Sequence, residues 1–240
     1  SGSFVDFDFA GKNRMYGSLM AIGFLYNFGV WSDKFIFWYG ASTGQTVIGP
    51  LKASLIYDLP IFLAYLSIIP GMAVFLTRME TDFVEYYDKF YNAVREGGSL
   101  DKIEHLRDEM VFTIRQGIFE IIKIQSIAVL VTFVAAPILL RLLGVSQLYQ
   151  GLLYIDVVAA GTQVVFLGLL NVFFYLDKRR IVLLLCSVFV VLNIAFTLLS
   201  LKLGPAYYGY GFALSLLFSV LLGMTLLDRK LEKLEYVTFM

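Results

Sequence analysis

Long runs of apolar residues, separated by shorter polar connections, dominate the pattern along this chain of 240 residues. A bilayer core about 30 Å thick requires roughly 20 helical residues to cross it. Six segments are long and apolar enough, so the pattern predicts six membrane-spanning helices. They cover approximately residues 15–39, 54–77, 117–143, 148–176, 181–203 and 206–227.

Basic residues are distributed unevenly between the two sides of these predicted spans. Fourteen of the nineteen Lys and Arg residues fall on one side: Lys12, Arg14, Arg78, Lys89, Arg95, Lys102, Arg107, Arg115, Lys178, Arg179, Arg180, Arg229, Lys230 and Lys233. Cytoplasmic connections of membrane proteins carry an excess of Lys and Arg. We therefore predict a multi-pass membrane protein with both chain ends in the cytoplasm.

The connection over residues 79–116 is the one sizeable segment that we predict outside the membrane. Apolar residues recur at helical spacing on both sides of the Gly97-Gly98 break. This pattern predicts a cytoplasmic helical hairpin with an apolar face, which lies on the membrane or docks a partner. A packed cap without a partner is an equally good interpretation. The docking candidates are Phe83, Tyr86, Tyr87, Phe90 and Tyr91.

Composition agrees with a membrane protein and excludes several other classes. Apolar residues make up 59% of the chain and charged residues 16%, against about 45–50% and about 25% in soluble domains. The formal net charge of zero gives no basic surface for nucleic acid. With a single Cys186 and a single His105 we expect no disulfide, no metal and no cofactor. The chain starts with Ser1 rather than Met, which indicates a fragment or a start that is not native.

Ionisable side chains inside predicted spans are the main candidates for a functional role, because charges in a membrane are costly. Asp33 and Lys34 lie in the first span, Asp58 near the start of the second and Asp156 in the fourth. All four fall in the predicted outer half. They are candidates to line an outward-opening polar cavity that contacts a substrate. Structural ion pairs, or side chains that reach the membrane surface, are the alternative.

Amide side chains form a second group of polar residues on otherwise apolar helices. They are Asn27, Gln125, Gln163, Asn171 and Asn193, of which Asn27, Gln163 and Asn171 are the substrate-pathway candidates. Hydrogen bonds between helices explain such residues as well, and we favour that interpretation. A sugar-binding cavity would use the same amides.

Three prolines interrupt the predicted spans and suggest places where the helices bend. Pro60 and the Pro70-Gly71 pair lie in the second span, and Pro137 lies in the third. Proline removes an intrahelical hydrogen bond and bends the helix. Bent helices suit the gating of one bundle against another, although a static kink is also common. We find no nucleophile–base set and no phosphate-binding loop, so we do not expect an enzyme.

Three motifs resemble the Pel exopolysaccharide transporter family (PelG), which belongs to a flippase superfamily of multidrug, lipid-linked oligosaccharide and polysaccharide exporters. They are Asp33–Trp38 (DKFIFW), Glu80–Asp88 (ETDFVEYYD) and Leu234–Met240 (LEYVTFM). The first two are distinctive because charged pairs inside aromatic runs are unusual. The resemblance covers essentially the whole chain.

The resemblance implies a fold and a role beyond what the pattern predicts. It implies an all-α membrane protein, a six-helix bundle that forms one lobe of a twelve-helix flippase, with this chain as the C-terminal half. The implied partners are the N-terminal half of the same transporter, membrane lipid, a cytoplasmic glycosyltransferase and other inner-membrane Pel subunits. The implied substrate is a galactosamine-rich, partly deacetylated polysaccharide.

Three functions therefore stay open at this point. The first is export of the polysaccharide through a polar cavity, where Asp33 and Asp156 would complement a cationic polymer. The second is a flippase for a lipid-linked oligosaccharide or a drug. The third is a membrane scaffold that docks a glycosyltransferase through residues 79–116 and does not transport by itself.

Overall fold

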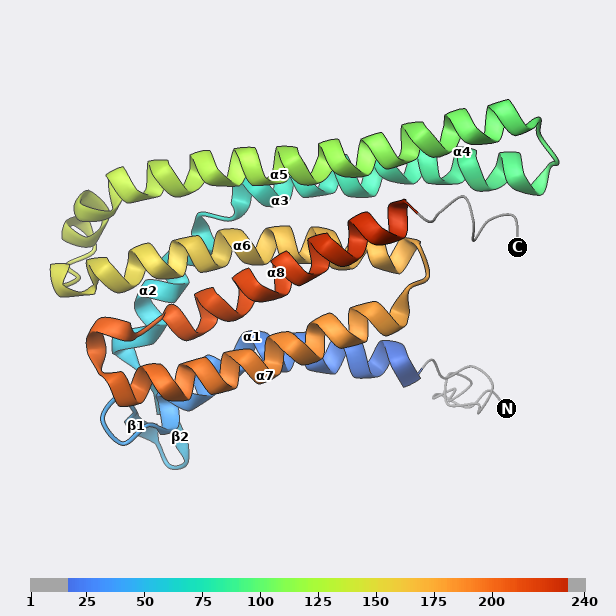
Figure 1. Ribbon diagram of the computed structural model, residues 1–240. Coiled ribbons are helices and arrows are strands. Elements are labelled where there is room, and N and C mark those ends of the chain that lie inside the picture. The colour runs from blue at the N-terminus through green and yellow to red at the C-terminus, as the bar shows by residue number, and fades with distance from the viewer. Residues whose placement is uncertain (1–16, 233–240) are drawn as a thin grey trace, which may run out of the picture.

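The computed structural model describes residues 17–232, and these residues are almost entirely helical (Figure 1). The main helices are α1 (Gly17–Tyr39), α2 (Leu55–Leu66), α3 (Ile69–Thr77), α4 (Phe83–Arg95), α5 (Leu100–Leu142), α6 (Gln150–Tyr175), α7 (Arg179–Leu203) and α8 (Tyr210–Leu231). Shorter turns precede α4, α6 and α8: a π-helix η2 (Arg78–Asp82) and the 3₁₀ turns η3 (Gln147–Tyr149) and η4 (Pro205–Tyr207). Lys12, Arg14, Lys233 and the Leu234–Met240 motif lie outside the described residues.

Four of these helices are individually long and apolar enough to cross a membrane, namely α5, α6, α7 and α8 with their flanking turns. A fifth candidate is the pair of α2 with the helical segment that starts at Ile69, which is bent by 45° at the break. Helix α1 coincides with the first predicted span, but it is not among these helices. Its polar residues Asn27, Asp33 and Lys34 lower its apolar character. The count of six spans therefore stays a prediction.

The helix ends are gathered at two opposite ends of the molecule (Figure 1). The start of α1, the α6–α7 connection, the end of α8 and the tip of the α4–α5 hairpin lie toward one end. The α5–α6 and α7–α8 connections and a small β-hairpin lie at the other. This arrangement agrees with the alternation that the basic residues predict. Which end faces the cytoplasm stays a prediction.

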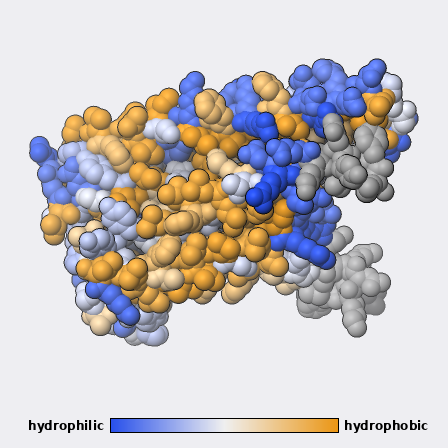
Figure 2. All heavy atoms as spheres, in the orientation of Figure 1, coloured by the Kyte–Doolittle hydropathy of each residue, from blue (hydrophilic) through white to orange (hydrophobic). Residues whose placement is uncertain are grey.

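Helix α6 forms the centre of the bundle, whereas α5 lies at its edge. Within the most apolar stretch of α6, 67% of the residues are buried, against 17% in that of α5. Figure 2 shows that apolar side chains cover most of the visible surface over the bundle, while polar residues gather toward the ends. An apolar surface of this extent on the outside is stable in lipid, because the hydrophobic effect opposes its exposure to water.

The predicted second span is broken between α2 and α3, at Ser67 and Ile68. Pro70 occupies the first turn of α3, where its missing N–H is not needed. The side chain of Gln125 in α5 enters the break, and its Nε2 donates to the Ser67 carbonyl at 3.2 Å. Gly71 leaves the room for it, because a Cβ there would overlap the Gln125 amide. By contrast, α2 continues through Pro60 and α5 continues through Pro137.

The segment predicted as a separate hairpin is continuous with the spans beside it. The first arm is α4, a turn at Gly97 with a positive φ of 71° follows, and the second arm is the beginning of α5. The 43-residue α5 therefore contains both the second arm and the predicted third span. At the base of the hairpin, Arg78 pairs with Glu120 of α5 and with Asp82. The hairpin extends beyond the rest of the bundle (Figure 1).

A two-stranded antiparallel sheet follows α1 and was not predicted from the sequence. Its strands are β1 (Gln45–Ile48) and β2 (Leu51–Ala53), joined through Gly49, whose φ is positive. The Tyr39 hydroxyl donates to the Pro50 carbonyl at 3.3 Å, which ties this turn to the end of α1.

Candidate functional site

Three of the four predicted ionisable residues come together inside the bundle. Asp33 of α1 is fully buried, and Lys34 is 6% exposed. The Lys34 ammonium lies 3.4 Å from both carboxylate oxygens of Asp33. The hydroxyl of Tyr57 in α2 donates to Asp33 at 2.5 Å. Asp33 and Lys34 thus form an ion pair, as the structural alternative expects.

Lys34 is held by neutral groups as well as by its carboxylate partner. Its ammonium donates to the Val30 carbonyl at 2.8 Å, one helical turn earlier. It also lies 5.0 Å from the centre of the Phe212 ring in α8 and 5.5 Å from that of Tyr65 in α2. Aromatic rings attract cations through their electron-rich faces, most strongly where water is excluded. The ammonium thus links α1 to α2 and α8.

Asp156 of α6 completes this group, but without a hydrogen-bond partner. It is fully buried, and neither of its carboxylate oxygens is hydrogen-bonded to the described residues. Its electrostatic neighbours are Asp33 and Lys34. We call Asp33, Lys34, Tyr57 and Asp156 the charged cluster. The cluster holds two carboxyl groups and one ammonium, and the ammonium makes its ion pair with Asp33. A buried charge without a partner is costly.

Gly209 lies directly against the charged cluster, although nothing in the sequence singled it out as a site residue. Its φ is +84°, a conformation that favours glycine. A Cβ at this position would lie 2.9 Å from Oδ1 of Asp156 and would also meet Leu152. The turn before α8 therefore closes over Asp156. The available signal was the Gly209-Tyr210-Gly211 sequence, which has no context of a nucleotide-binding loop.

Asp58, the fourth predicted residue, has a local structural role. Its carboxylate accepts from the Ser54 backbone N–H at 2.9 Å, at the start of α2. Acidic residues in a first turn satisfy free N–H groups and complement the helix dipole. The same carboxylate accepts from the Trp38 indole N–H at 2.8 Å. It therefore joins the end of α1 to the start of α2.

The predicted amide residues differ from one another in their surroundings. Gln163 bridges two tyrosines: it accepts from Tyr65 at 3.1 Å and donates to Tyr26 at 3.2 Å. Asn171 has a buried amide oxygen without a partner among the described residues. Asn27 is exposed, and its side chain donates to the Gly23 carbonyl of the same helix. Interhelical hydrogen bonding, the interpretation that we favoured, thus fits Gln163 and not Asn27.

Asn193 makes the most extensive amide network, and the interhelical hydrogen bonds that we favoured for the amides fit it well. From α7 it donates to the Gly29 carbonyl at 2.8 Å and to the Ser32 hydroxyl at 3.1 Å, both on α1. Thr197 donates to its oxygen at 3.0 Å. The residues of this contact are all buried, so the network fixes α1 against α7.

Two of the five partner-docking candidates on the hairpin are buried, and the other three are half-buried. Phe83 and Phe90 are buried, at 0% and 1% exposure, so their side chains are not available to a partner. The rings of Tyr87 and Tyr91 lie 4.5 Å apart, and Tyr87 also contacts Tyr175 of α6. Burial, with smaller effects of Tyr91 and Asp88, raises the pKa of the Tyr87 phenol. This aromatic face holds the hairpin together and joins it to α6, which fits the packed-cap interpretation.

A groove of about 410 Å³ lies between α5, α6 and α8. Its lining is mainly aliphatic, with Gln125, Ser126 and Thr162 as polar residues, and it includes no residue of the charged cluster. Within residues 17–232, no group of three His, Cys, Asp or Glu residues is arranged to hold a metal ion.

Comparisons with known proteins give one match. Residues 1–239 match the family model PelG, described as "Putative exopolysaccharide Exporter (EPS-E)". No curated protein and no solved structure matches the chain.

Proposed function

Because the chain belongs to the PelG family of exopolysaccharide exporters, we propose that it is one lobe of a carrier that moves a polysaccharide across the bacterial inner membrane. The proposed substrate is the galactosamine-rich Pel polymer. A second lobe, formed by the N-terminal half of the same transporter, would complete the translocation pathway. Both chain ends, and the hairpin at the same end of the bundle, would lie in the cytoplasm.

The charged cluster is the observation that carries this proposal. A structural ion pair leaves no carboxyl group unmatched, whereas Asp156 has no hydrogen bond to any described residue, and the one ammonium of the cluster pairs with Asp33. A partly deacetylated galactosamine polymer carries ammonium groups, which complement an acidic site. A lipid-linked pyrophosphate would instead require a basic site. The excess of carboxyl groups over ammonium groups therefore favours an amino sugar over a pyrophosphate carrier.

A carrier also needs a way to open, because the cluster is sealed in this conformation. Asp33 and Asp156 are fully buried, so the substrate reaches them only after helices separate. The break between α2 and α3 provides a joint, since α2 carries Tyr57 on one side of it. Gating of one set of helices against another is the usual mode of such carriers.

The hairpin, which extends from the bundle, would dock the cytoplasmic glycosyltransferase or another inner-membrane Pel subunit through its outer surface.

Substitution of the two carboxyl groups tests the carrier proposal. In the full transporter, we expect Asp156→Asn and Asp33→Asn each to lower polymer export at equal protein level in the membrane. The Asn side chain keeps the shape and removes the charge. Export is measured as secreted amino-sugar polymer per amount of transporter.

Asp228→Asn is the matched control, because Asp228 is exposed at the end of α8 and pairs there with Arg115. It should export as the unmodified transporter does. If both cluster variants also export normally, these residues take no part in transport. If a deletion of residues 79–116 abolishes assembly with the synthesis machinery while part of the export remains, the scaffold role belongs to the hairpin and transport belongs to the bundle.

A further inference from the structure

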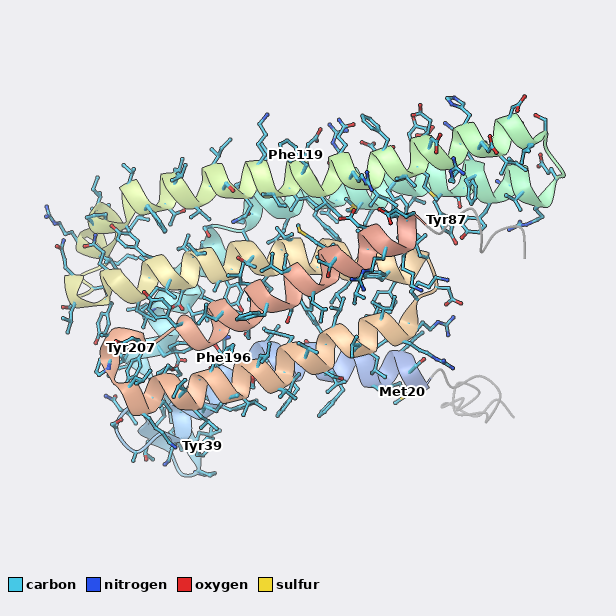
Figure 3. All side chains as sticks on the ribbon, viewed as in Figure 1. Met20, Tyr39, Tyr87, Phe119, Phe196 and Tyr207 are labelled. Carbon is cyan, nitrogen blue, oxygen red and sulfur yellow. The ribbon has the colours of Figure 1, made fainter. Side chains whose placement is uncertain are left out.

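Helix α1 carries a row of exposed aromatic rings along its whole length. Phe24, Phe28, Trp31, Phe35 and Tyr39 follow one another at intervals of three or four residues, which places them on one face of the helix. Their exposed fractions run from 37% to 67%. We call these five residues the aromatic stripe. Figure 3 labels Met20, just before it, and Tyr39 at its far end, beside the β-hairpin.

The outer surface of α5 shows what a lipid-facing helix of this molecule looks like. In its apolar half most of the exposed residues are aliphatic, among them Ile127, Leu130, Val131, Val134, Ile138 and Leu142, and Ser126 is also exposed. The aromatic stripe on α1 contains no aliphatic residue. It also includes the exposed amide of Asn27 between Phe24 and Phe28. The amide gives this face of α1 a hydrogen-bonding group that lipid tails cannot use.

The rings of the aromatic stripe are held in place by contacts with neighbouring rings. Phe24 and Phe28 are stacked with centres 5.7 Å apart and planes within 7°. Further along, Trp38 contacts both Trp31 and Phe35 edge-on. Trp38 is itself fixed by its hydrogen bond to Asp58. Rigid, preordered rings bind a ligand with a small loss of conformational freedom.

Flat aromatic rings combined with an amide suit a carbohydrate. The apolar C–H face of a pyranose ring stacks on an aromatic face, and its hydroxyls need hydrogen-bonding groups such as the Asn27 amide or the Tyr39 hydroxyl. An ammonium group on the sugar adds cation–π attraction, which is strongest over Trp. Rings at successive helical turns, about 5.4 Å apart along the axis, offer a polymer a series of equivalent sites.

We propose that the aromatic stripe is the track on which the amino-sugar polymer slides through the transporter. This inference rests on the proposed export function and names the surface that the substrate contacts. The stripe and the charged cluster meet at Trp31, whose ring centre lies 6.0 Å from the Lys34 ammonium. The polymer thus runs along α1 beside the cluster.

Replacement of rings by leucine tests the track, because leucine preserves packing against lipid or helices and removes only the flat face. In the full transporter, the variant Phe24→Leu with Phe28→Leu and Phe35→Leu should export at least about tenfold less polymer at equal membrane level, given a typical aromatic contribution per ring. Purified in detergent, it should also bind soluble galactosamine oligomers more weakly. Phe28→Tyr, which keeps the ring, should export normally.

The matched control replaces three exposed phenylalanines outside α1, namely Phe112, Phe119 and Phe218, by leucine and should export normally. If the stripe variant and the control variant both export normally, the proposed track is wrong, because lipid or the other lobe then covers the stripe. Equal losses in both, or a lower membrane level of the stripe variant alone, overturn it too. The export function itself fails separately, if cells with the unmodified transporter secrete no more polymer than cells without it.

Discussion

The bundle and the helical hairpin bury opposite kinds of side chain. Inside the bundle, Asp33, Lys34 and Asp156 are buried among apolar helices, while apolar residues cover the outside. Inside the hairpin, Phe83 and Phe90 are buried, and charged residues such as Glu85 and Lys89 lie outside, where they pair with each other. The two regions belong to one continuous chain, and α5 runs through both.

This difference follows from the medium around each region. In water, burial of apolar rings stabilises a helical hairpin, so aromatic residues gather inside. In lipid the surroundings of a helix are already apolar, so helices gain little free energy from burying further apolar side chains against each other. Polar contacts and close packing then hold the helices together, as Asn193 does between α1 and α7. The charges of the bundle must therefore be satisfied by each other, and a substitution there should have the largest effect.

We expect Lys34→Met to be the most destabilising of these changes. It keeps the length of the side chain and removes the ammonium group that pairs with Asp33. Breaking one partner out of a buried pair typically costs about 3–5 kcal/mol, because the remaining charge has no compensation. The loss should appear as a lower midpoint of thermal unfolding in detergent. Size-exclusion chromatography after heating measures the fraction that stays folded.

The double variant Asp33→Asn with Lys34→Met distinguishes charge from packing. It removes both charges, and the amide oxygen that replaces the carboxylate can still accept from the Tyr57 hydroxyl. Replacement of a whole buried pair is often close to neutral, so most of the lost stability should return. If the double variant is as unstable as Lys34→Met, the ammonium stabilises the bundle through its contacts with the Val30 carbonyl and the Tyr65 and Phe212 rings rather than through Asp33.

In the hairpin, Phe90→Ala should have the next largest effect, about 3 kcal/mol. Phe90 is 1% exposed, so the change removes a buried ring and leaves a cavity between α4 and α5. The loss should stay local. Trypsin should cut faster at Arg95 or Lys102, near the tip, while the bundle unfolds at an unchanged temperature.

Phe112→Ala is the control for the hairpin, because Phe112 is 63% exposed and its removal leaves no cavity. Its proteolysis should resemble that of the unmodified protein. If Phe90→Ala lowers the unfolding temperature of the whole molecule instead, the hairpin and the bundle form one cooperative unit, and the contrast between them has no energetic meaning.

Sequence reasoning recovered the helices well and the family correctly. Long apolar runs determine spans almost by length alone, so the ranges for α6, α7 and α8 agree with the structure within a few residues at each end. Helical spacing around Phe83 and Phe90 indicated the hairpin arms. The pairing of Asp33 with Lys34 was predicted because charges in lipid need partners.

Features that depend on contacts between distant residues were not predictable. The break in the second span was placed at prolines, but it lies at Ser67 and Ile68, where Gln125 of another helix inserts. Nothing local distinguishes Asp58, which caps a helix, from Asp156, which has no hydrogen-bond partner among the described residues. The closure of Gly209 over Asp156 likewise appears only when α6 and α8 are side by side.

The smallest expected effect belongs to the exposed pair that joins the two regions. Arg115 of α5 and Asp228 of α8 lie 3.4 Å apart, and each side chain is more than half exposed. Exposed ion pairs contribute about 0.5 kcal/mol or less, since water and salt screen them. A double-mutant cycle with Arg115→Gln and Asp228→Asn should therefore give a coupling energy near this value, which falls further in high salt. A coupling above about 1.5 kcal/mol that salt leaves unchanged would mean that lipid or the second lobe covers the pair. The boundary between the lipid-like and the water-like region would then lie farther along α5 toward the hairpin tip.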